Sequence, residues 1–388
     1  MRIAHVITRL IVGGAQENTV LSCEGLHARG HEVTLITGPT TGPEGSIVDR
    51  ARGGGYAFVK IPYLVRQLSP TRDLHAYLAL KRWCRAARPD VVHTHSSKAG
   101  VLGRLAAHAA GVPVIVHTIH GMSFNRTQTR MVQAAYATAE RYCAKRCHAI
   151  VSVADAMTRQ AIAADIGAAD QYETIRSGMT VADFDPARVN GTALRASWGI
   201  QPEHVLVGTV ARLFENKGYE QLIDVISRVA PINQNLRFVW IGDGAHRPEY
   251  EEELRRRGLR DRVVLTGLLK PAVIPQALAA IDILAHTSQW EGLPRAVVQA
   301  LLLKKPVVSF DIDGAPEVVI PGQTGELAPL NDTAAFAEKL LKLAADANRR
   351  RAYGEEGRRR CVVEFDAATM VDRLDQLYRR LAAKHGSG

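Results

Sequence analysis

Short apolar runs rich in β-branched residues alternate with longer stretches of helical periodicity along the first half of the chain. Runs of this kind predict strands that are buried on both faces, and the stretches between them predict the covering helices. Repeated alternation of the two is typical of a parallel sheet. The strands predicted in this half are Ile3–Thr8, Glu32–Thr37, Ala57–Ile61, Val91–His95, Val114–His117, Ala149–Val153 and Glu173–Arg176.

The helices predicted between these strands carry their apolar residues on one face and their charged residues on the other. The alternation stops in the run Thr180–Trp198, where Pro186, Asn190 and Gly191 predict a linker. The predicted helices are Ala15–Arg29, Asp73–Arg88, Lys98–Ala110, Gln128–Cys147 and Asp155–Asp165.

The pattern restarts after the linker and predicts a second α/β unit of similar size. Residues after Asp332 are almost wholly helical in pattern, and the last segment, Asp366–Ala383, is long enough to reach back to the first unit. The predicted strands are Val205–Ala211, Leu236–Ile241, Val263–Thr266, Ile283–His286 and Val307–Phe310, and the helices are Tyr219–Val229, Glu249–Arg257, Val273–Ala280 and Pro294–Leu303.

We therefore expect two Rossmann-like domains in tandem, residues 1–180 with the returning helix at about 366–385, and residues 181–365. Ligands of such sheets bind beyond the carboxyl ends of the strands, so a cleft between the two domains is the expected site. The length of 388 residues fits two domains, and the composition, 46% hydrophobic and 23% charged, excludes disordered and collagen-like classes. No uninterrupted apolar run approaches the ~18 residues of a membrane span, which predicts a soluble cytosolic protein.

The five cysteines are an odd number without a C-x-x-C pair, which predicts reduced thiols rather than a disulfide framework. Cys143 and Cys147 would share a helix face next to His148, but further metal ligands are missing, so we interpret both as core residues.

Positive charge is concentrated in the first half of the chain. Residues 1–180 hold 21 Lys and Arg against 12 Asp and Glu, whereas residues 181–388 hold 28 against 27. The densest stretches are residues 72–88 and 126–146. Such stretches attract anionic partners, among them nucleic acid, phospholipid surfaces and pyrophosphate-bearing substrates. A merely solvated helix face is the alternative.

Candidate chemistry begins with Gly13-Gly14-Ala15-Gln16, after the first strand and at the start of a helix. Glycines there allow a ligand close to the backbone, and a helix N-terminus favours a negative group. The dinucleotide fingerprint G-x-G-x-x-G is absent, and the second strand ends in Thr37-Gly38 where a ribose-binding acid would stand. These absences disfavour a nicotinamide enzyme.

Two cations, Arg212 and Lys217, follow the first strand of the second unit. An arginine and a lysine at such a position can clamp a diphosphate and stabilise the charge that develops on a leaving phosphate. Surface residues without a role are the alternative.

The richest stretch runs from Thr287 to Leu301. Pro294 fits the first position of a helix, which places Glu291 in the preceding loop and Gln299 on the helix. A carboxylate there can accept hydrogen bonds from sugar hydroxyls while exposed backbone amides meet a phosphate. Capping of the helix by Glu291 is the alternative.

Six motifs occur in the order found in GT-B glycosyltransferases, and the chain resembles a retaining member of glycosyltransferase family 4, also called glycosyl transferases group 1, from about residue 2 to about residue 380. The motifs are Gly13-Gly14-Ala15-Gln16, His117-Thr-Ile-His120-Gly121, Arg212 to Lys217-Gly218, Ile241-Gly242-Asp243-Gly244, Glu291-Gly-Leu-Pro294, and Asp313-Gly-Ala-Pro316-Glu317-Val with Thr324-Gly325.

The resemblance implies the GT-B fold and transfer of a sugar from a nucleoside diphosphate with retention, without a metal or other cofactor. It implies that the second domain binds the donor and the first the acceptor. As catalytic residues it implies His120, Arg212, Lys217 and Glu291; as donor-binding residues Gly14, Arg212, Lys217, Gly242, Gly292, Leu293, Pro294 and Gln299; and on the acceptor side Gly13, Gln16 and Lys98.

The sequence departs from the family at Gln299, where a second glutamate commonly accepts bonds from the ribose. An amide oxygen can still accept, though less strongly than a charge. Asp311-Ile-Asp313 matches the metal-binding D-x-D of another glycosyltransferase fold, but we interpret it as a turn. His93, His95 and His117 lie at strand ends, and no carboxylate spacing completes a zinc site with them.

We therefore expect a glycosyltransferase that moves a hexose or N-acetylhexosamine from a nucleoside-diphosphate sugar, with UDP as the expected nucleotide, to a saccharide or polyprenyl-linked acceptor in glycan, exopolysaccharide or cell-envelope synthesis. The expected partners include an anionic membrane surface, reached through residues 72–88 and 126–146, and exclude nucleic acid. The expected location is the cytoplasm, with peripheral association at the inner face of the membrane. A GT-B nucleotide-sugar epimerase and a non-catalytic nucleotide-sugar binding protein are the alternatives.

Overall fold

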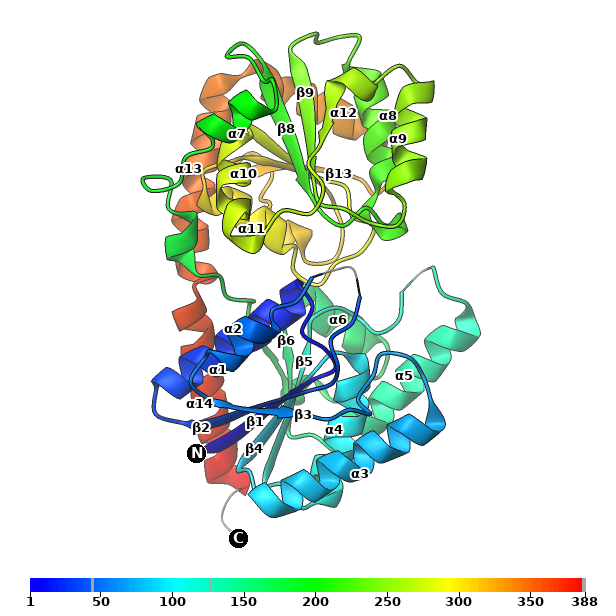
Figure 1. Ribbon diagram of the computed structural model, residues 1–388, viewed down its shortest axis with the longest axis vertical. Helices are drawn as coiled ribbons and strands as arrows, with labels where there is room; N and C mark the ends of the chain where they lie inside the picture. The colour runs from blue at the N-terminus through cyan, green and yellow to red at the C-terminus, as the bar shows by residue number, and fades with distance from the viewer. Residues whose placement is uncertain (43–44, 126, 386–388) are drawn as a thin grey trace. The chain divides into compact units, whose positions relative to one another are not determined.

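The computed structural model describes residues 1–42, 45–125 and 127–385. The chain divides into two compact units, one formed by Met1–Gly178 together with the segment that begins at Ala367, the other by Met179–Asp366. Each unit contains one parallel sheet with helices packed on it, which confirms the expected pair of Rossmann-like sheets (Figure 1).

The sheet of the first unit has the strand order β3-β2-β1-β4-β5-β6-β7, and all its pairs are parallel. The chain starts in the middle of the sheet, builds one side, and then returns to build the other, so the topological switch point lies between β1 and β4. The strands are β1 (Arg2–Ile7), β2 (Glu32–Thr37), β3 (Ala57–Lys60), β4 (Val91–His95), β5 (Val114–Ile119), β6 (Ala149–Ser152) and β7 (Tyr172–Thr174).

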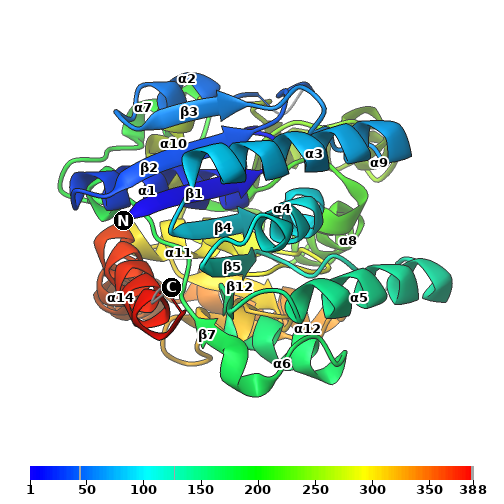
Figure 2. The same ribbon diagram turned by 90° about the horizontal axis from the view of Figure 1, so that it is seen from below.

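Helices cover both faces of this sheet. The C-terminal helix α14 packs beside α1 on one face, whereas α3, α4 and α5 lie on the other (Figure 2). The helices of this unit are α1 (Gly14–Ala28), α2 (Val48–Arg52), α3 (Pro70–Ala87), α4 (Ser97–Ala109), α5 (Arg130–Ala144), α6 (Asp155–Ala163), the 3₁₀ turn η1 (Ala169–Gln171) and α14 (Ala367–His385).

The C-terminal helix α14 returns to the first unit, which confirms the expectation that the last segment of the chain reaches back to it. Gly25 of α1 lets α14 approach closely, because a Cβ atom there would lie 2.5 Å from Val371. His31 Nε2 lies 2.9 Å from the Asp375 carboxylate, and the buried Tyr378 hydroxyl bonds to His93. Apolar and polar contacts together therefore fix α14 on the sheet.

The sheet of the second unit has the order β10-β9-β8-β11-β12-β13, again with parallel pairs. The strands are β8 (Val205–Val210), β9 (Leu236–Ile241), β10 (Val263–Leu265), β11 (Ile283–His286), β12 (Val307–Phe310) and β13 (Gly325–Ala328). The helices are α7 (Thr192–Ser197), α8 (Tyr219–Val229), α9 (Arg247–Arg256), α10 (Ile274–Ala280), α11 (Arg295–Leu302), α12 (Thr333–Ala345) and α13 (Ala347–Glu364), with 3₁₀ turns η2 (Val181–Phe184), η3 (Glu215–Lys217), η4 (Arg260–Arg262), η5 (Pro271–Val273) and η6 (Ala315–Glu317).

Two sequence-based expectations about this unit are wrong. The run Thr180–Trp198 is not a plain linker, because η2 and α7 form within it. Pro294 is not the first residue of a helix: it is the N-cap, and α11 begins at Arg295. In addition, the sequence analysis missed β13, which is held by its register with β12.

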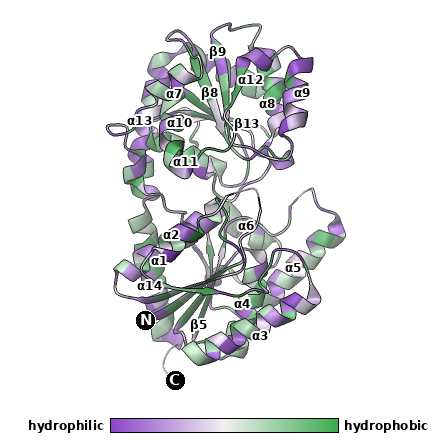
Figure 3. Ribbon diagram, in the orientation of Figure 1, coloured by the Kyte–Doolittle hydropathy of each residue, from purple (hydrophilic) through white to green (hydrophobic). Residues whose placement is uncertain are grey.

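Hydrophobic residues concentrate in the strands, while the helices show mixed surfaces and α9 is largely hydrophilic (Figure 3). All five cysteines are buried and unpaired, as expected of core residues, and burial raises the pKa of Cys147 to about 11. Within the described ranges, no helix combines the length and the apolar character that a membrane crossing requires.

Candidate functional site

The predicted donor-binding loops of the second unit follow β8, β9, β11 and β12, whose carboxyl ends share one edge of the sheet. Backbone hydrogen bonds tie these loops together. Leu213 N–H donates to the Asp243 carbonyl at 3.1 Å, and Gln289 N–H donates to the Asn216 carbonyl at 2.9 Å. The structure therefore brings together residues that lie more than 70 positions apart in the sequence.

Two glycines make this close packing possible. Gly218 has φ of 69°, and a Cβ atom there would lie 1.8 Å from the Thr287 carbonyl oxygen. Gly242 has φ of 142°, and a Cβ atom there would lie 2.1 Å from the Ala211 carbonyl oxygen. Any other residue at either position would push the loops apart.

Lys217 and Glu291, both predicted as catalytic, form an ion pair at this edge. Lys217 Nζ lies 2.5 Å from Glu291 Oε1, and the Ser288 hydroxyl donates to the same oxygen at 2.9 Å. His286 Nε2 lies 3.8 Å from this oxygen. Burial raises the pKa of Glu291, but the Lys217 ammonium and then His286 outweigh it and hold the pKa below its ordinary value. Glu291 is therefore a carboxylate at neutral pH.

Asp313 positions the backbone of Glu291. The Glu291 N–H donates to Asp313 Oδ2 at 2.7 Å, and Asp313 itself has φ of 42°, as in a tight turn. This geometry agrees with our interpretation of Asp311-Ile-Asp313 as a turn. The support of Glu291 by this turn could not be predicted from the sequence, because the two residues meet only through the parallel pairing of β11 and β12.

The remaining donor-side candidates of the second unit lie near the same edge. Gly292, Leu293 and Pro294 are buried, and Gln299 is half-buried on α11. Across the described residues, the Gln299 side chain has no hydrogen bond, so its amide is available to a ligand. The Arg212 guanidinium lies 5.8 Å from the centre of the Phe214 ring.

In the first unit, the Gly13-Gly14 turn leads from β1 into α1 as expected. Gly13 is the N-cap, with an extended backbone, and its carbonyl accepts the Glu17 N–H at 3.0 Å. A Cβ atom on Gly13 would lie 2.7 Å from Gln16 Oε1, so the Gln16 side chain lies over Gly13. Within the described residues no side chain caps the start of α1, so its first N–H groups can receive an anion.

Lys98, predicted on the acceptor side, is bound within the first unit. Its ammonium donates to Asp73 Oδ1 at 2.6 Å and to the Gln67 carbonyl at 2.5 Å, and its side chain is 10% exposed. These bonds join α4 to α3 and to the loop before it. A role for Lys98 toward an acceptor stays a prediction.

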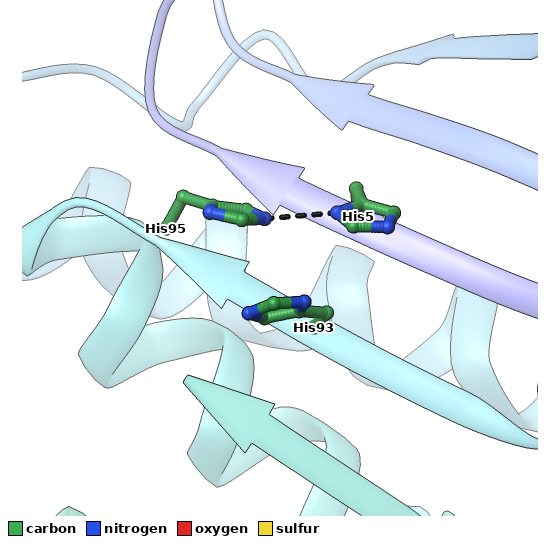
Figure 4. A group of neighbouring side chains, drawn as sticks. All are labelled: His5, His93 and His95. Atoms are coloured by element: carbon green, nitrogen blue, oxygen red, sulfur yellow. Dashed lines mark hydrogen bonds between the residues drawn. The ribbon is translucent and has the colours of Figure 1, made fainter. Parts of the chain in front are cut away.

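His120, the predicted catalytic histidine, follows β5 and belongs to a cluster of imidazoles. The strand register places His5 of β1 beside His93 of β4, and His95 beside Thr118 of β5. His5 Nδ1 lies 2.9 Å from His95 Nε2 (Figure 4). His95 Nδ1 lies 3.0 Å from His120 Nε2. The sequence analysis missed His5, because a single histidine in an apolar strand carries no signal without the register.

His117 lies apart from this cluster, on the other face of the sheet. Its Nδ1 lies 2.9 Å from the Thr94 hydroxyl, and a Cβ atom on Gly100 of α4 would lie 2.6 Å from its ring. His117 is therefore not on the face of the sheet that carries His93 and His95. Alternate residues of a strand point to opposite faces, and the register pairs His117 with Thr94 rather than with His93.

Ligand atoms of His5, His93 and His95 lie within 4.8 Å of one another, the one group of metal-ligand type found in the described part of the chain. The rings of His5 and His95 are stacked at 14°, however, and His93 and His95 pack at 4.3 Å between ring centres. His93 also bonds on both sides, to the Tyr378 hydroxyl and, at 2.6 Å, to Thr118 Oγ1. Except at His5 Nε2, these ring nitrogens thus point into hydrogen bonds rather than toward one common centre.

Comparison with known families gives two matches that together span most of the chain. Residues 13–178 match the family described as "Glycosyl transferase 4-like domain", and residues 191–360 match "Glycosyl transferases group 1". The two matches coincide with the two structural units.

Individual relatives extend over nearly the full length. The chain is 27% identical to the UDP-Gal:alpha-D-GlcNAc-diphosphoundecaprenol alpha-1,3-galactosyltransferase of Escherichia coli, covering 97% of this chain and 96% of that protein. It is 28% identical to the alpha-maltose-1-phosphate synthase of Mycolicibacterium smegmatis, covering 86% and 89%. Among solved structures, Anabaena HepE in complex with UDP and glucose shares the fold with a TM-score of 0.85 at 20% identity, covering 98% of this chain and 100% of that one.

Proposed function

Because this chain belongs to the GT-B glycosyltransferases of family 4 type, we propose that it transfers a hexose or N-acetylhexosamine from a UDP-sugar, with retention, to a polyprenyl-diphosphate-linked saccharide. The observation that supports this proposal most directly is the Lys217–Glu291 pair at the carboxyl edge of the second sheet. It places a cation for a diphosphate next to a carboxylate for sugar hydroxyls.

In the proposed reaction, Lys217 and Arg212 bind the diphosphate and Glu291 accepts hydrogen bonds from the sugar. The bond between the anomeric carbon and the diphosphate oxygen breaks, and the acceptor oxygen bonds to the same face of that carbon. The leaving diphosphate takes the acceptor's hydroxyl proton, so the products are UDP and the glycoside. The two cations stabilise the charge of the leaving group, and the proposal needs no metal for that step.

The lipid-linked acceptor is supported by the relative that acts on a diphosphoundecaprenol-linked sugar and by the surface of two helices, α3 and α5. Each helix has a single acidic residue, and both acids are bound internally. Asp73 bonds to Lys98 at 2.6 Å, and Glu140 bonds to the buried Arg104 at 2.6 Å. Apart from these two bound acids, the side chains of α3 and α5 are therefore either basic or uncharged.

These two basic faces also expose apolar side chains. Leu74 and Leu78 of α3 are 54% and 49% exposed, and Met131 and Tyr142 of α5 are 84% and 53% exposed. The aromatic side chain of Trp83, also on α3, is half-buried. Arg126, the first residue of the basic stretch 126–146, lies outside the described residues. Basic residues beside exposed apolar ones are the composition that favours an anionic lipid surface.

The enzymatic proposal is tested by incubating the protein with UDP-galactose, UDP-glucose, UDP-N-acetylglucosamine, GDP-mannose and ADP-glucose, with and without a synthetic N-acetylglucosaminyl-diphosphoprenol. We expect acceptor-dependent release of UDP from one UDP-sugar, and an α-linked product by NMR. Release of GDP from GDP-mannose or of ADP from ADP-glucose, with no release of UDP from a UDP-sugar, would contradict UDP as the nucleotide of the donor. A β-linked product would exclude retention. Isomerisation of the sugar without transfer would favour an epimerase.

The membrane proposal is tested by flotation with vesicles. The protein should float with anionic vesicles at low salt and stay behind with neutral ones, because the attraction is electrostatic and screened over ~8 Å at physiological salt. The Lys81→Glu, Arg82→Glu, Arg85→Glu variant on α3 should not float. The control Arg255→Glu, Arg256→Glu, Arg257→Glu on α9 changes the net charge equally and should float as the wild type does. Equal behaviour of the two variants would contradict a specific surface.

A further inference from the structure

Three imidazoles form a continuous hydrogen-bonded chain that ends at His120. His5 Nδ1 bonds to His95 Nε2 at 2.9 Å, and His95 Nδ1 bonds to His120 Nε2 at 3.0 Å. His5 and His95 are fully buried, 0% and 1% exposed, so no solvent enters the chain from behind. The resemblance to the family implies a catalytic role for His120 but gives no role to the other two.

The far end of this chain is an unpaired atom. His5 Nε2 is buried and, within the described residues, has no hydrogen-bond partner. Burial lowers the pKa of His5 to about 3 and that of His95 well below its ordinary value, so both rings are neutral and carry one proton each. A neutral imidazole has one donor and one acceptor nitrogen, and its bonds decide which is which.

The unpaired atom sets the direction of the chain. A buried N–H group without an acceptor is rarer in proteins than a buried acceptor without a donor. The His5 proton therefore sits on Nδ1, where it donates to His95 Nε2. His95 must then carry its own proton on Nδ1 and donate it to His120 Nε2. This leaves Nδ1 as the protonated nitrogen of His120.

We infer that His5 and His95 are positioning residues that hold His120 as a hydrogen-bond donor through Nδ1–H. This inference rests on the proposed function and on the catalytic role of His120 that the resemblance to the family implies. Fixed in this way, His120 donates to an oxygen of the donor, either of the leaving diphosphate or of the sugar, and does not accept the proton of the acceptor hydroxyl.

The same chain opposes a role for His120 as a base. A proton cannot be added at Nδ1, which already carries one. A proton added at Nε2 would face the His95 Nδ1–H, and relieving that clash would reverse every bond and place a proton on the unpaired His5 Nε2. The leaving diphosphate is thus the better proton acceptor in the proposed reaction.

The first test reads the tautomers of the wild-type protein directly. Ring ¹⁵N NMR of histidine-labelled protein, with the His120 signals assigned by their loss in His120→Ala, should show the Nδ1–H form for His5, His95 and His120. The tautomers themselves are read in the wild-type protein, and His120→Ala serves only to assign the His120 signals. An Nε2–H form of His120 would overturn the inference.

The second test uses ring-conserving variants. His5→Phe and His95→Phe remove the nitrogens, and we expect kcat for UDP release to fall about 10–100-fold, as for other partners that orient a catalytic imidazole, with little change in KM for the UDP-sugar. His5→Asn should restore most of the activity, because its side-chain amide can donate where Nδ1–H did. The matched control is His93→Phe: His93 is equally buried beside both residues but bonds to Tyr378 and Thr118.

The outcomes separate the two proposals. If His120→Ala retains kcat, the proposed role of His120 fails, and the inference fails with it. If His120→Ala loses kcat while His5→Phe and His95→Phe retain it, the inference alone fails. If His93→Phe lowers kcat as much as His95→Phe, the effect is one of packing, which also contradicts the inference. Should a phenylalanine variant fail to fold, His5→Asn and the wild-type NMR measurement still decide.

Discussion

The substitution Lys217→Ala separates two tasks of one ammonium group, one seen in the structure and one proposed. Lys217 neutralises Glu291 in the free protein, at 2.5 Å, and in the proposed reaction it also stabilises the leaving diphosphate. Without it, Glu291 keeps the Ser288 hydroxyl at 2.9 Å and the His286 ring at 3.8 Å. The variant should therefore lose both stability and turnover.

The loss of stability follows from the burial of the pair. Leaving a fully buried charge unpaired costs about 3–5 kcal/mol. The side chains of Lys217 and Glu291 are 15% and 23% exposed, so water relieves part of this cost. We expect about 1–2 kcal/mol, which lowers the midpoint of thermal unfolding of a unit this size by roughly 2–8 °C. Lys342→Ala is the matched control, because Lys342 pairs with Glu338 at 2.5 Å with both side chains more than 60% exposed, and it should shift the midpoint little.

The pH dependence gives the sign of the effect. In the wild type the pKa of Glu291 lies below its ordinary value, so the pair stabilises the fold above the ordinary carboxyl pKa of about 4.3, and this is lost as pH falls below it. In Lys217→Ala the burial remains and the main opposing charge is gone, so the pKa of Glu291 should rise above its ordinary value. The difference between variant and wild type should then be largest near pH 7 and shrink as pH falls toward 5.

Thermal scans at pH 7, 6 and 5 measure this trend, and UDP release at saturating UDP-sugar measures the catalytic loss. Removing one preorganised charge from a transition state should lower turnover by about 10²–10³. A variant with wild-type turnover would remove Lys217 from the leaving-group site. A midpoint shift that is the same at every pH would show that the pair with Glu291 is not its cause.

Three further predictions concern Gln299, the need for a metal, and the buried Arg104. Gln299→Glu should tighten UDP binding or leave it unchanged, whereas Gln299→Leu should weaken it by about 1–3 kcal/mol in isothermal titration; equal affinities would place the ribose elsewhere. EDTA should leave UDP-sugar turnover intact, and a strict requirement for Mn²⁺ would contradict the proposal that cationic side chains alone stabilise the leaving group. In denaturant unfolding, Arg104→Leu should destabilise the first unit by about 3–5 kcal/mol, because Glu140 is then buried without a partner. The double variant Arg104→Leu, Glu140→Leu should recover much of that loss. No recovery would show that packing rather than charge is responsible.

The strand pattern predicted most of both sheets because their strands are short apolar runs with clear ends. Val91–His95, Leu236–Ile241 and Val307–Phe310 have the predicted bounds. The misses have a common cause. Gly325–Ala328 lacks a strong strand pattern and becomes β13 through its hydrogen bonds to β12, and α7 follows a Pro, Asn and Gly sequence that masks a helix of six residues. Tertiary context decides such segments, and a single sequence does not show it.

The candidate site divides in the same way. Lys217 and Glu291 were each predicted from a local motif, but their ion pair joins residues 74 positions apart and depends on the order of β8 and β11 in the sheet. Asp313 was predicted as a turn, and its bond to Glu291 N–H appears only when β11 and β12 pair. Motifs therefore identify the residues that carry charge, while the sheet determines which of them support one another.

The candidate sites of the two units differ in charge: the Lys217–Glu291 pair of the second unit is ionised, whereas the buried imidazoles of the first unit are neutral. In the second unit, fixed charges of both signs, Lys217 and Glu291, remain ionised because each neutralises the other. In the first unit, burial keeps His5 and His95 neutral, and their order of protons is set by one unpaired nitrogen. A neutral donor such as His120 binds an uncharged ground-state oxygen weakly and a developing negative charge more strongly, which is the difference that accelerates a reaction. In the proposed transfer, the charged edge thus supplies most of the binding of the diphosphate, and the neutral chain of imidazoles supplies a contact that gains strength as the glycosidic bond to the diphosphate breaks.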